Sequence, residues 1–264
     1  MLLALAAALT WAQQGTPNLS RTEMEEFLRT AKVISHKQAA KGVTRSLRAT
    51  LSDGKITHDA HIQSIDETRT EFRSDRAVEL NFKDTYKFNI AGYRLATMLG
   101  LENVPVSVER KWAGKTSAFT WWVDDVMMDE DARRKKNIDP PNPDLWNKYM
   151  YMVRVFDQLI CNTDRNLQNL LIQKDWNMWM IDHTRAFRIR KDLPNVKNLT
   201  RCDRVLLERM RALDKPTLQA NLKPYLTNTE IDALLARRDK IVEFFDAEVK
   251  SKGEGAVLYE VLKK

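Results

Sequence analysis

The pattern of apolar residues changes near residue 145, and this change constrains the fold more than any other feature of the sequence. Before it, short stretches rich in β-branched and aromatic residues alternate with turn residues, which is typical of strands. After it, apolar residues from Leu145 to Ile160 recur at helical spacing and form one wide stripe. This order predicts an α+β fold in which a small β-rich lobe with one helix precedes a larger, mostly helical lobe.

Capping and turn signals mark the elements of the first half. Ser20 and Glu23 have the spacing of a capping box, Asp53-Gly54 indicates a hairpin turn, and Gly100 is placed to end a helix. The expected elements are a helix at 21–31, strands at 46–51 and 56–65, a charged loop at 68–84, a helix at 86–99, and antiparallel strands at 104–110 and 117–123.

The second half begins after a polar segment, 124–144, that holds three prolines and the basic run Arg133 to Lys136. We expect this segment to be a linker or flexible loop between the lobes. Thr227 and Glu230 form a second capping box. The expected elements that follow are a long helix from 145, short strands at 170–172 and 178–181, and helices at 202–213, 215–223 and 228–250.

The first twelve residues, MLLALAAALTWA, form an uncharged apolar run. A membrane-spanning helix needs about 20 such residues, so the run is better suited to a secretory signal peptide. We therefore predict an exported protein whose mature chain begins near Gln13; a buried N-terminal helix is the alternative. The expected boundaries are a signal peptide at 1–12, an N-terminal helical extension at 13–32, a β-rich lobe at 33–124, a connector at 125–144 and a helical lobe at 145–264.

Composition narrows the possible partners. Among 264 residues, 43 Lys and Arg outnumber 36 Asp and Glu, which gives a net charge of +7 and favours anionic partners. No basic motif interleaved with aromatic residues appears, so the sequence does not indicate nucleic-acid binding, and it contains no transmembrane span. Cys161 and Cys202 could form at most one intrachain disulfide, which the sequence does not decide.

Three polar residues have a spacing that suits phosphoryl transfer. Asp164 lies in a polar loop directly after the long helix, Asn169 follows five residues later, and Asp182 lies eighteen residues after Asp164. The predicted hairpin folds the chain back, so that Asn169 and Asp182 face one point with Asp164 alongside. Two oxygen ligands beside a free carboxylate suit Mg²⁺ together with substrate phosphates.

This segment, with Asn162-Thr163-Asp164-Arg165 before Asn169 and Asp182, resembles the catalytic and metal-binding segments of the protein-kinase-like superfamily. It is most similar to the phosphatidylinositol 3-/4-kinases, the HipA-like kinases and the secretory-pathway kinases of the Golgi casein kinase and four-jointed type. The stretch from Ile90 to Val104-Pro105 resembles the regulatory helix and next strand of the secretory kinases. The layout is also similar to a group of exported bacterial proteins.

The resemblance implies a role for each matching residue. Asp164 would be the catalytic base, and Asn169 and Asp182 would hold Mg²⁺ or Mn²⁺ with ATP. The other nucleotide contacts that it implies are Gly42 in the loop over the phosphates, Trp121 and Trp122 near the adenine, and Val123 just beyond.

Two positions depart from the pattern of active relatives, which carry a strand lysine paired with a helix glutamate. The matching residues here are Gln63 and Asn89, both neutral amides. Such a pair could hydrogen-bond and hold the helix, but it supplies no positive charge to the phosphates. The residues that could substitute from elsewhere are Lys55, Lys83, Lys87 or a nearby arginine.

Two functions therefore stay open. One is a kinase-like transfer of the ATP γ-phosphoryl group to a protein, lipid or sugar hydroxyl, which the retained Asp164, Asn169 and Asp182 favour. The other is an inactive pseudokinase that serves as a nucleotide-binding or scaffold module, which Gln63 and Asn89 favour. Transfer of AMP by a kinase fold is a third possibility that no residue specifically supports.

Overall fold

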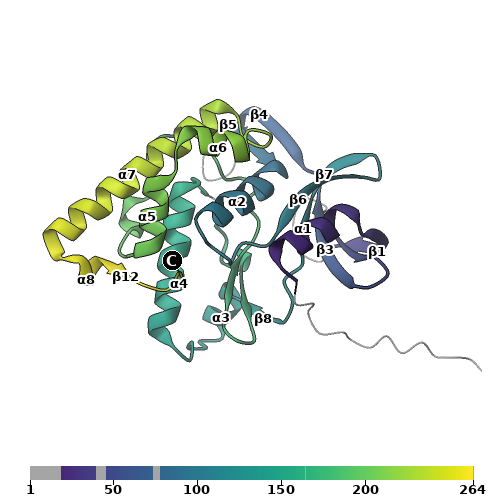
Figure 1. Ribbon diagram of the computed structural model, residues 1–264, viewed down its shortest axis with the longest axis horizontal. Coiled ribbons are helices and arrows are strands. Elements are labelled where there is room, and N and C mark those ends of the chain that lie inside the picture. The colour runs from purple at the N-terminus through teal and green to yellow at the C-terminus, as the bar shows by residue number, and fades with distance from the viewer. Residues whose placement is uncertain (1–18, 40–45, 74–77, 164, 264) are drawn as a thin grey trace, which may run out of the picture.

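A computed structural model describes residues 19–39, 46–73, 78–163 and 165–263 of the chain. Figure 1 shows a β-rich half, formed by the earlier part of the chain, beside a half made mostly of helices. The predicted α+β architecture is therefore confirmed. The segment 1–12, Gly42 and Asp164 lie outside the described residues. Within the described part, no helix combines the length and the apolar character needed to cross a membrane.

The β-rich half is built on a five-stranded antiparallel sheet. Its strands are β1 (Lys32–Gln38), β2 (Leu47–Ser52), β3 (Thr57–Gln63), β6 (Ser107–Trp112) and β7 (Lys115–Trp121). They pair in the order β1-β2-β3-β7-β6. The predicted hairpin turn at Asp53-Gly54 joins β2 to β3, and the positive φ of Gly54, 89°, is one that glycine adopts without steric cost.

Side chains alternate between the two faces of this sheet. The outer face packs on helix α1 (Arg21–Thr30), where Phe27 meets the ring of Trp121 edge-on at 5.7 Å. The opposite face, called here the inner face, carries four residues that share one side of β2, β3 and β7: Arg48, His61, Gln63 and Thr120. Helix α2 (Lys87–Met98) covers one end of the inner face.

The predicted helix signals of this half are confirmed. Ser20 and Glu23 form a complete capping box at the start of α1. Gly100 follows α2 with a φ of 70°, and a Cβ at this position would collide with the guanidinium of Arg209. Arg209 donates a hydrogen bond to the carbonyl oxygen of Leu99 at 3.2 Å, so a small residue here allows the helical half to close the end of α2.

The predicted loop at 68–84 is wrong. The segment belongs to a two-stranded antiparallel ribbon made of β4 (Asp66–Arg73) and β5 (Val78–Thr85). Most of its side chains are exposed and many are charged, so the alternation that identifies a half-buried strand is weak. The ribbon is anchored by Phe72 and Phe82, whose rings stack at 4.3 Å and lie beneath the guanidinium of Arg185.

The predicted flexible loop at 124–144 is also wrong for part of its length. The segment contains strand β8 (Val126–Asp129) and helix α3 (Glu130–Lys135). Glu130 is fully buried and accepts hydrogen bonds of 2.6 Å from both Arg133 and Arg134. Arg133 and Arg134 of the basic run therefore neutralise a buried carboxylate. The prediction of a linker or flexible loop did not anticipate this role.

The helical half follows the predicted order. Its main elements are α4 (Pro143–Leu159), β9 (Leu170–Gln173), β10 (Met178–Met180), α5 (Arg204–Ala212), α6 (Lys215–Leu222) and α7 (Asn228–Lys252). Shorter elements are 3-10 turns at Leu167–Asn169 and Val196–Asn198, β11 (Cys202–Asp203), α8 (Glu254–Val257) and β12 (Leu258–Tyr259). The predicted capping box of Thr227 and Glu230 begins α7. Strands β8, β9 and β10 form a small antiparallel sheet in the order β10-β9-β8.

Candidate functional site

A buried ion pair fixes the loop that follows α4. Arg165 donates to the two carboxylate oxygens of Asp157 at 2.9 Å each, and Asn162 Nδ2 donates to the same carboxylate at 3.1 Å. The side chains of Arg165 and Asp157 are only 12% and 10% exposed. A bidentate, enclosed pair of this kind restricts the backbone at Arg165.

The same arginine reaches the chain that follows β10. Its guanidinium donates to the carbonyl oxygen of Ile181 at 2.9 Å and lies 3.2 Å from Nε2 of His183. Arg165 therefore connects the end of α4 to the residues on either side of Asp182.

Asn169 and Asp182 lie next to each other at the open end of the β9–β10 hairpin. The carbonyl oxygen of Asn169 accepts a 3.0 Å hydrogen bond from the amide of Ile181. Asp182 is exposed and has a φ of 55°, a left-handed conformation that non-glycine residues seldom adopt. The structure thus brings these two predicted residues together, while their role as metal ligands stays a prediction.

Gln63 and Asn89 are hydrogen-bonded to each other. Asn89 Nδ2 donates to Gln63 Oε1 at 2.8 Å, and Asn89 Oδ1 accepts from the backbone amide of His183 at 2.8 Å. Gln63 and Asn89 are 2% and 7% exposed. Uncharged hydrogen bonds therefore tie α2 to β3 on one side and to the residue after Asp182 on the other.

His183 is a buried neutral imidazole and not an exposed side chain. Burial, reinforced by the nearby charge of Arg165, holds its pKa well below the usual 6.5. Its ring packs on α2 at Gly92, where an added Cβ would lie 3.3 Å from the imidazole. A larger residue at Gly92 would push His183 and the Asp182 backbone away from α2.

His61 is a residue of the site that the sequence analysis did not assign. It lies two residues before Gln63 on β3, so both side chains point from the inner face. Burial lowers the pKa of His61, and the negative charge of Asp182 opposes that shift. The position of His61 two residues before Gln63 was the sequence signal that could have placed it on the same face of the strand.

The two consecutive tryptophans face in opposite directions. Trp121 stacks on His58 at 3.7 Å on the outer face, and His58 Nε2 contacts Asp124 at 2.6 Å. Trp122 lies beneath the guanidinium of Arg48, which is 4.2 Å from the ring centroid on the side of the inner face. Of the two residues predicted near an adenine, Trp122 is therefore on the face that carries His61. Val123 follows and is buried.

The lysines considered as substitutes for a strand lysine are engaged elsewhere. Lys83 donates to Glu230 and Lys87 to Asp66, while Lys55 lies in the β2–β3 turn. Arg48 is directly opposite His61 in the β2–β3 register, and its Nε donates to Asp59 at 2.6 Å. On the described part of the inner face, Arg48 is thus the cationic residue paired with His61 in the strand register.

The donor set suits a hard divalent cation. The Asp182 carboxylate is exposed and the Asn169 side chain is half-buried, and both supply oxygen. Within the part of the chain that the structure describes, no group of three His, Cys, Asp or Glu side chains could hold a metal ion. A cation here would complete its shell with water and phosphate oxygens, as Mg²⁺ and Mn²⁺ do.

The two cysteines do not take part in this site. Cys161 and Cys202 are both free and buried, and burial raises the pKa of each thiol. Cys161 has a φ of 50° at the turn that ends α4. Neither thiol is therefore activated as a nucleophile.

No protein-family model and no curated protein matches this chain. Solved structures do match it. The structure of hydra Fam20 with sugar has a TM-score of 0.66 at 15% identity and covers 90% of this chain and 92% of its own. The Golgi casein kinase with Mn/ADP bound has a TM-score of 0.62 at 13% identity and covers 91% and 80%.

A bacterial structure matches more weakly. The Helicobacter pylori proinflammatory kinase CtkA has a TM-score of 0.51 at 10% identity and covers 81% of this chain and 92% of its own. All three neighbours are kinase-like, so the chain has the protein-kinase-like fold that its sequence predicts, near the Fam20 type.

Proposed function

We propose that this protein is a kinase-like phosphotransferase that moves the γ-phosphoryl group of ATP to a hydroxyl acceptor with Mg²⁺ or Mn²⁺. The observation that carries the proposal is the junction of Asn169 and Asp182, braced by Arg165 directly after the loop that contains Asp164. The Mn/ADP named with the Golgi casein kinase structure supports the same ligands.

Each residue has a distinct role in the proposed reaction. Asp164 orients the acceptor hydroxyl and takes its proton. Asn169 and Asp182 hold the divalent cation, which would offset the charge of the phosphates. The nucleotide would lie against the inner face, with Trp122 and Val123 beside the adenine, Gly42 over the phosphates, and Gln63 with Asn89 holding α2 in place. Trp121, on the outer face, would support Trp122 from behind.

The acceptor class can be ranked for testing. A protein, lipid or sugar hydroxyl would each serve the chemistry. The sugar named with the hydra Fam20 structure makes a sugar hydroxyl the first acceptor to test.

Calorimetric titration of ATP, with and without Mn²⁺ or Mg²⁺, tests the nucleotide site. We expect metal-dependent binding that Asp182→Ala removes and that Asp239→Ala, which alters an exposed carboxylate on α7, leaves intact. Asp164→Ala should keep nucleotide affinity but abolish transfer. Metal-dependent binding that survives Asp182→Ala would contradict the metal role.

A catalytically inactive scaffold is the second candidate, and one observation favours it. The Gln63–Asn89 hydrogen bond carries no charge, whereas active relatives place a lysine at the phosphates. In a folded sample, absence of ATP binding with either metal would support this function over phosphotransfer.

We also propose export. The Golgi casein kinase neighbour supports a secretory setting, and residues 1–12 have the composition of a signal peptide. Mass spectrometry of the protein recovered from its native host should give a chain that begins near Gln13. An intact N-terminus inside the cell would contradict export.

A further inference from the structure

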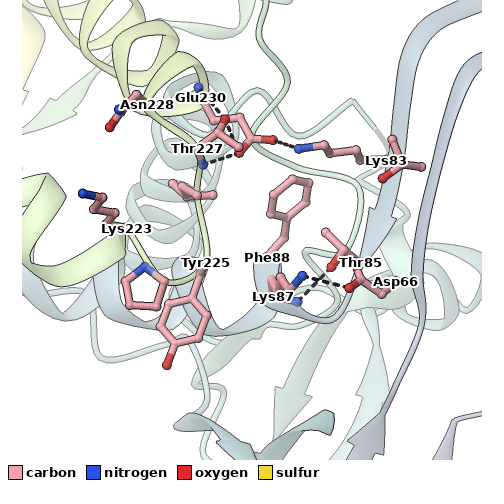
Figure 2. A pocket seen from close by; sticks show the side chains of 13 residues that line it. Asp66, Lys83, Thr85, Lys87, Phe88, Lys223, Tyr225, Thr227, Asn228 and Glu230 are labelled. Atoms are coloured by element: carbon pink, nitrogen blue, oxygen red, sulfur yellow. Dashed lines mark hydrogen bonds and ion pairs between the residues drawn. The ribbon is translucent and has the colours of Figure 1, made fainter. Parts of the chain in front are cut away.

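A cavity of about 400 Å³ opens between the base of the β4–β5 ribbon, the first turn of α2 and the connection from α6 to α7 (Figure 2). None of the residues to which we give a nucleotide or metal role lines it. The cavity lies where the β-rich half meets the helical half. One lining residue, Thr85, donates its backbone amide to the carbonyl oxygen of Thr184 at 3.0 Å, two residues after Asp182.

Three lysines border the cavity. Lys83 and Lys87 come from β5 and α2, and Lys223 stands on the other side, just after α6 (Figure 2). Lys83 donates to Glu230 at 2.5 Å and Lys87 donates to Asp66 at 2.8 Å. Lys223 is exposed, and its ammonium group has no hydrogen-bond or ion-pair partner among the residues that the structure describes.

The two carboxylates of the lining are already occupied. Glu230 is 1% exposed, and its Oε2 accepts from the amide and the hydroxyl of Thr227 at 2.7 and 2.8 Å. Its other oxygen is taken by Lys83. With three lysines against two acids that each hold one of them, the lining carries an excess positive charge of one.

The rest of the lining can hold an organic group. Tyr225, Pro224 and Phe88 contribute carbon surface, while the hydroxyl groups of Thr85 and Thr227 are already bonded to Asp66 and Glu230. A cavity of this size is within the range of small-molecule sites and far exceeds a bare phosphate ion. Lysine ammonium groups at the rim, beside an aromatic wall, suit a small organic molecule that carries an anionic group.

We propose that this cavity binds a phosphate monoester of a small organic molecule. Lysine ammonium groups bind phosphate as point charges, and a dianion can share its three oxygens among several of them. A monocarboxylate has less charge and fewer acceptor atoms, so it binds more weakly. Because Lys87 and Lys223 come from different halves, the ligand bridges them. The proposal does not depend on the proposed phosphotransfer.

Calorimetric titration of phenyl phosphate into the full chain, without divalent metal, tests this site. We expect saturable binding that Lys223→Ala weakens about fivefold, the value of one ion pair of partly exposed groups. Lys250→Ala, at an exposed lysine near the other end of α7, is the matched control and should leave the affinity unchanged. Benzoate should bind more weakly than phenyl phosphate.

Three results would overturn the proposal: no saturable binding of phenyl phosphate, equal effects of Lys223→Ala and Lys250→Ala, or equal affinities for phenyl phosphate and benzoate. An excess of ADP with Mn²⁺ separates the cavity from the nucleotide site. Phenyl phosphate binding that persists in this excess supports the cavity, whereas its loss would assign phenyl phosphate to the nucleotide site and refute the inference.

Discussion

Arg165→Met is expected to destabilise the protein strongly, because it leaves a buried carboxylate without its cation. The Asp157 side chain is 10% exposed, and it would lose the two 2.9 Å bonds from Arg165. Removing one partner of a buried ion pair costs about 3–5 kcal/mol. The carbonyl oxygen of Ile181 would also lose its 2.9 Å bond, worth about 1 kcal/mol. We expect the free energy of unfolding to fall by about 4–6 kcal/mol.

Urea denaturation followed by circular dichroism measures this change. Arg69→Met is the matched control, because Arg69 and its partner Glu67 have side chains that are 50% and 40% exposed. An exposed pair contributes less than about 1 kcal/mol. The double variant Arg165→Met/Asp157→Leu should recover much of the loss, since no uncompensated charge stays buried.

A loss of stability for Arg165→Met no greater than that for Arg69→Met would refute this reasoning. So would a double variant as unstable as Arg165→Met alone. Either result would mean that water reaches the Asp157 carboxylate. The Arg165–Asp157 ion pair would then stabilise the segment around Asp182 less than its geometry indicates.

Three further predictions concern the site and the α3 segment. The double variant Gln63→Lys/Asn89→Glu should transfer phosphate faster than the native chain, and no gain would contradict the proposed pairing. Gln63→Lys alone buries an unpaired ammonium, so it should lower the thermal midpoint of unfolding. His61→Ala should weaken Mn²⁺-ADP binding about tenfold in calorimetry if a charged phosphate bonds to the imidazole, and unchanged affinity would exclude that contact. Burial alone would raise the pKa of Glu130, but hydrogen bonds from Arg133 and Arg134 lower it below 4.5. The ionised Glu130 therefore stabilises the fold above that pH, and its contribution to stability is lost on acidification. Glu130→Gln should therefore flatten the decline in stability below about pH 4.5, and an unchanged decline would contradict this.

Local signals of turn and cap chemistry predicted much of the fold. Asp53-Gly54, the two capping boxes and Gly100 each require a specific backbone conformation, so they identify element ends without knowledge of the tertiary structure. The hydrogen bond between Gln63 and Asn89 agrees with the pairing expected at these positions. Their function in nucleotide binding stays a prediction.

Elements stabilised by charge were harder to predict. The β4–β5 ribbon has little apolar alternation, because its docking contacts include ion pairs such as Arg188–Glu79 and arginines over Phe82. The α3 helix likewise depends on a buried Glu130. The direction of His61 depends on strand register, and the register is fixed by β2 and β7, which lie at a distance in the sequence.

The neutral pair at Gln63 and Asn89 separates two tasks that a lysine–glutamate pair would combine. Holding α2 against the sheet and the Asp182 loop needs only hydrogen bonds, and Asn89 makes one to each side. Supplying charge to a phosphate needs a cation, and on the inner face Arg48 is already bonded to Asp59. A nucleotide in the proposed site would therefore depend on divalent metal more strongly than one beside a strand lysine, so chelation of the metal should remove nearly all of its affinity.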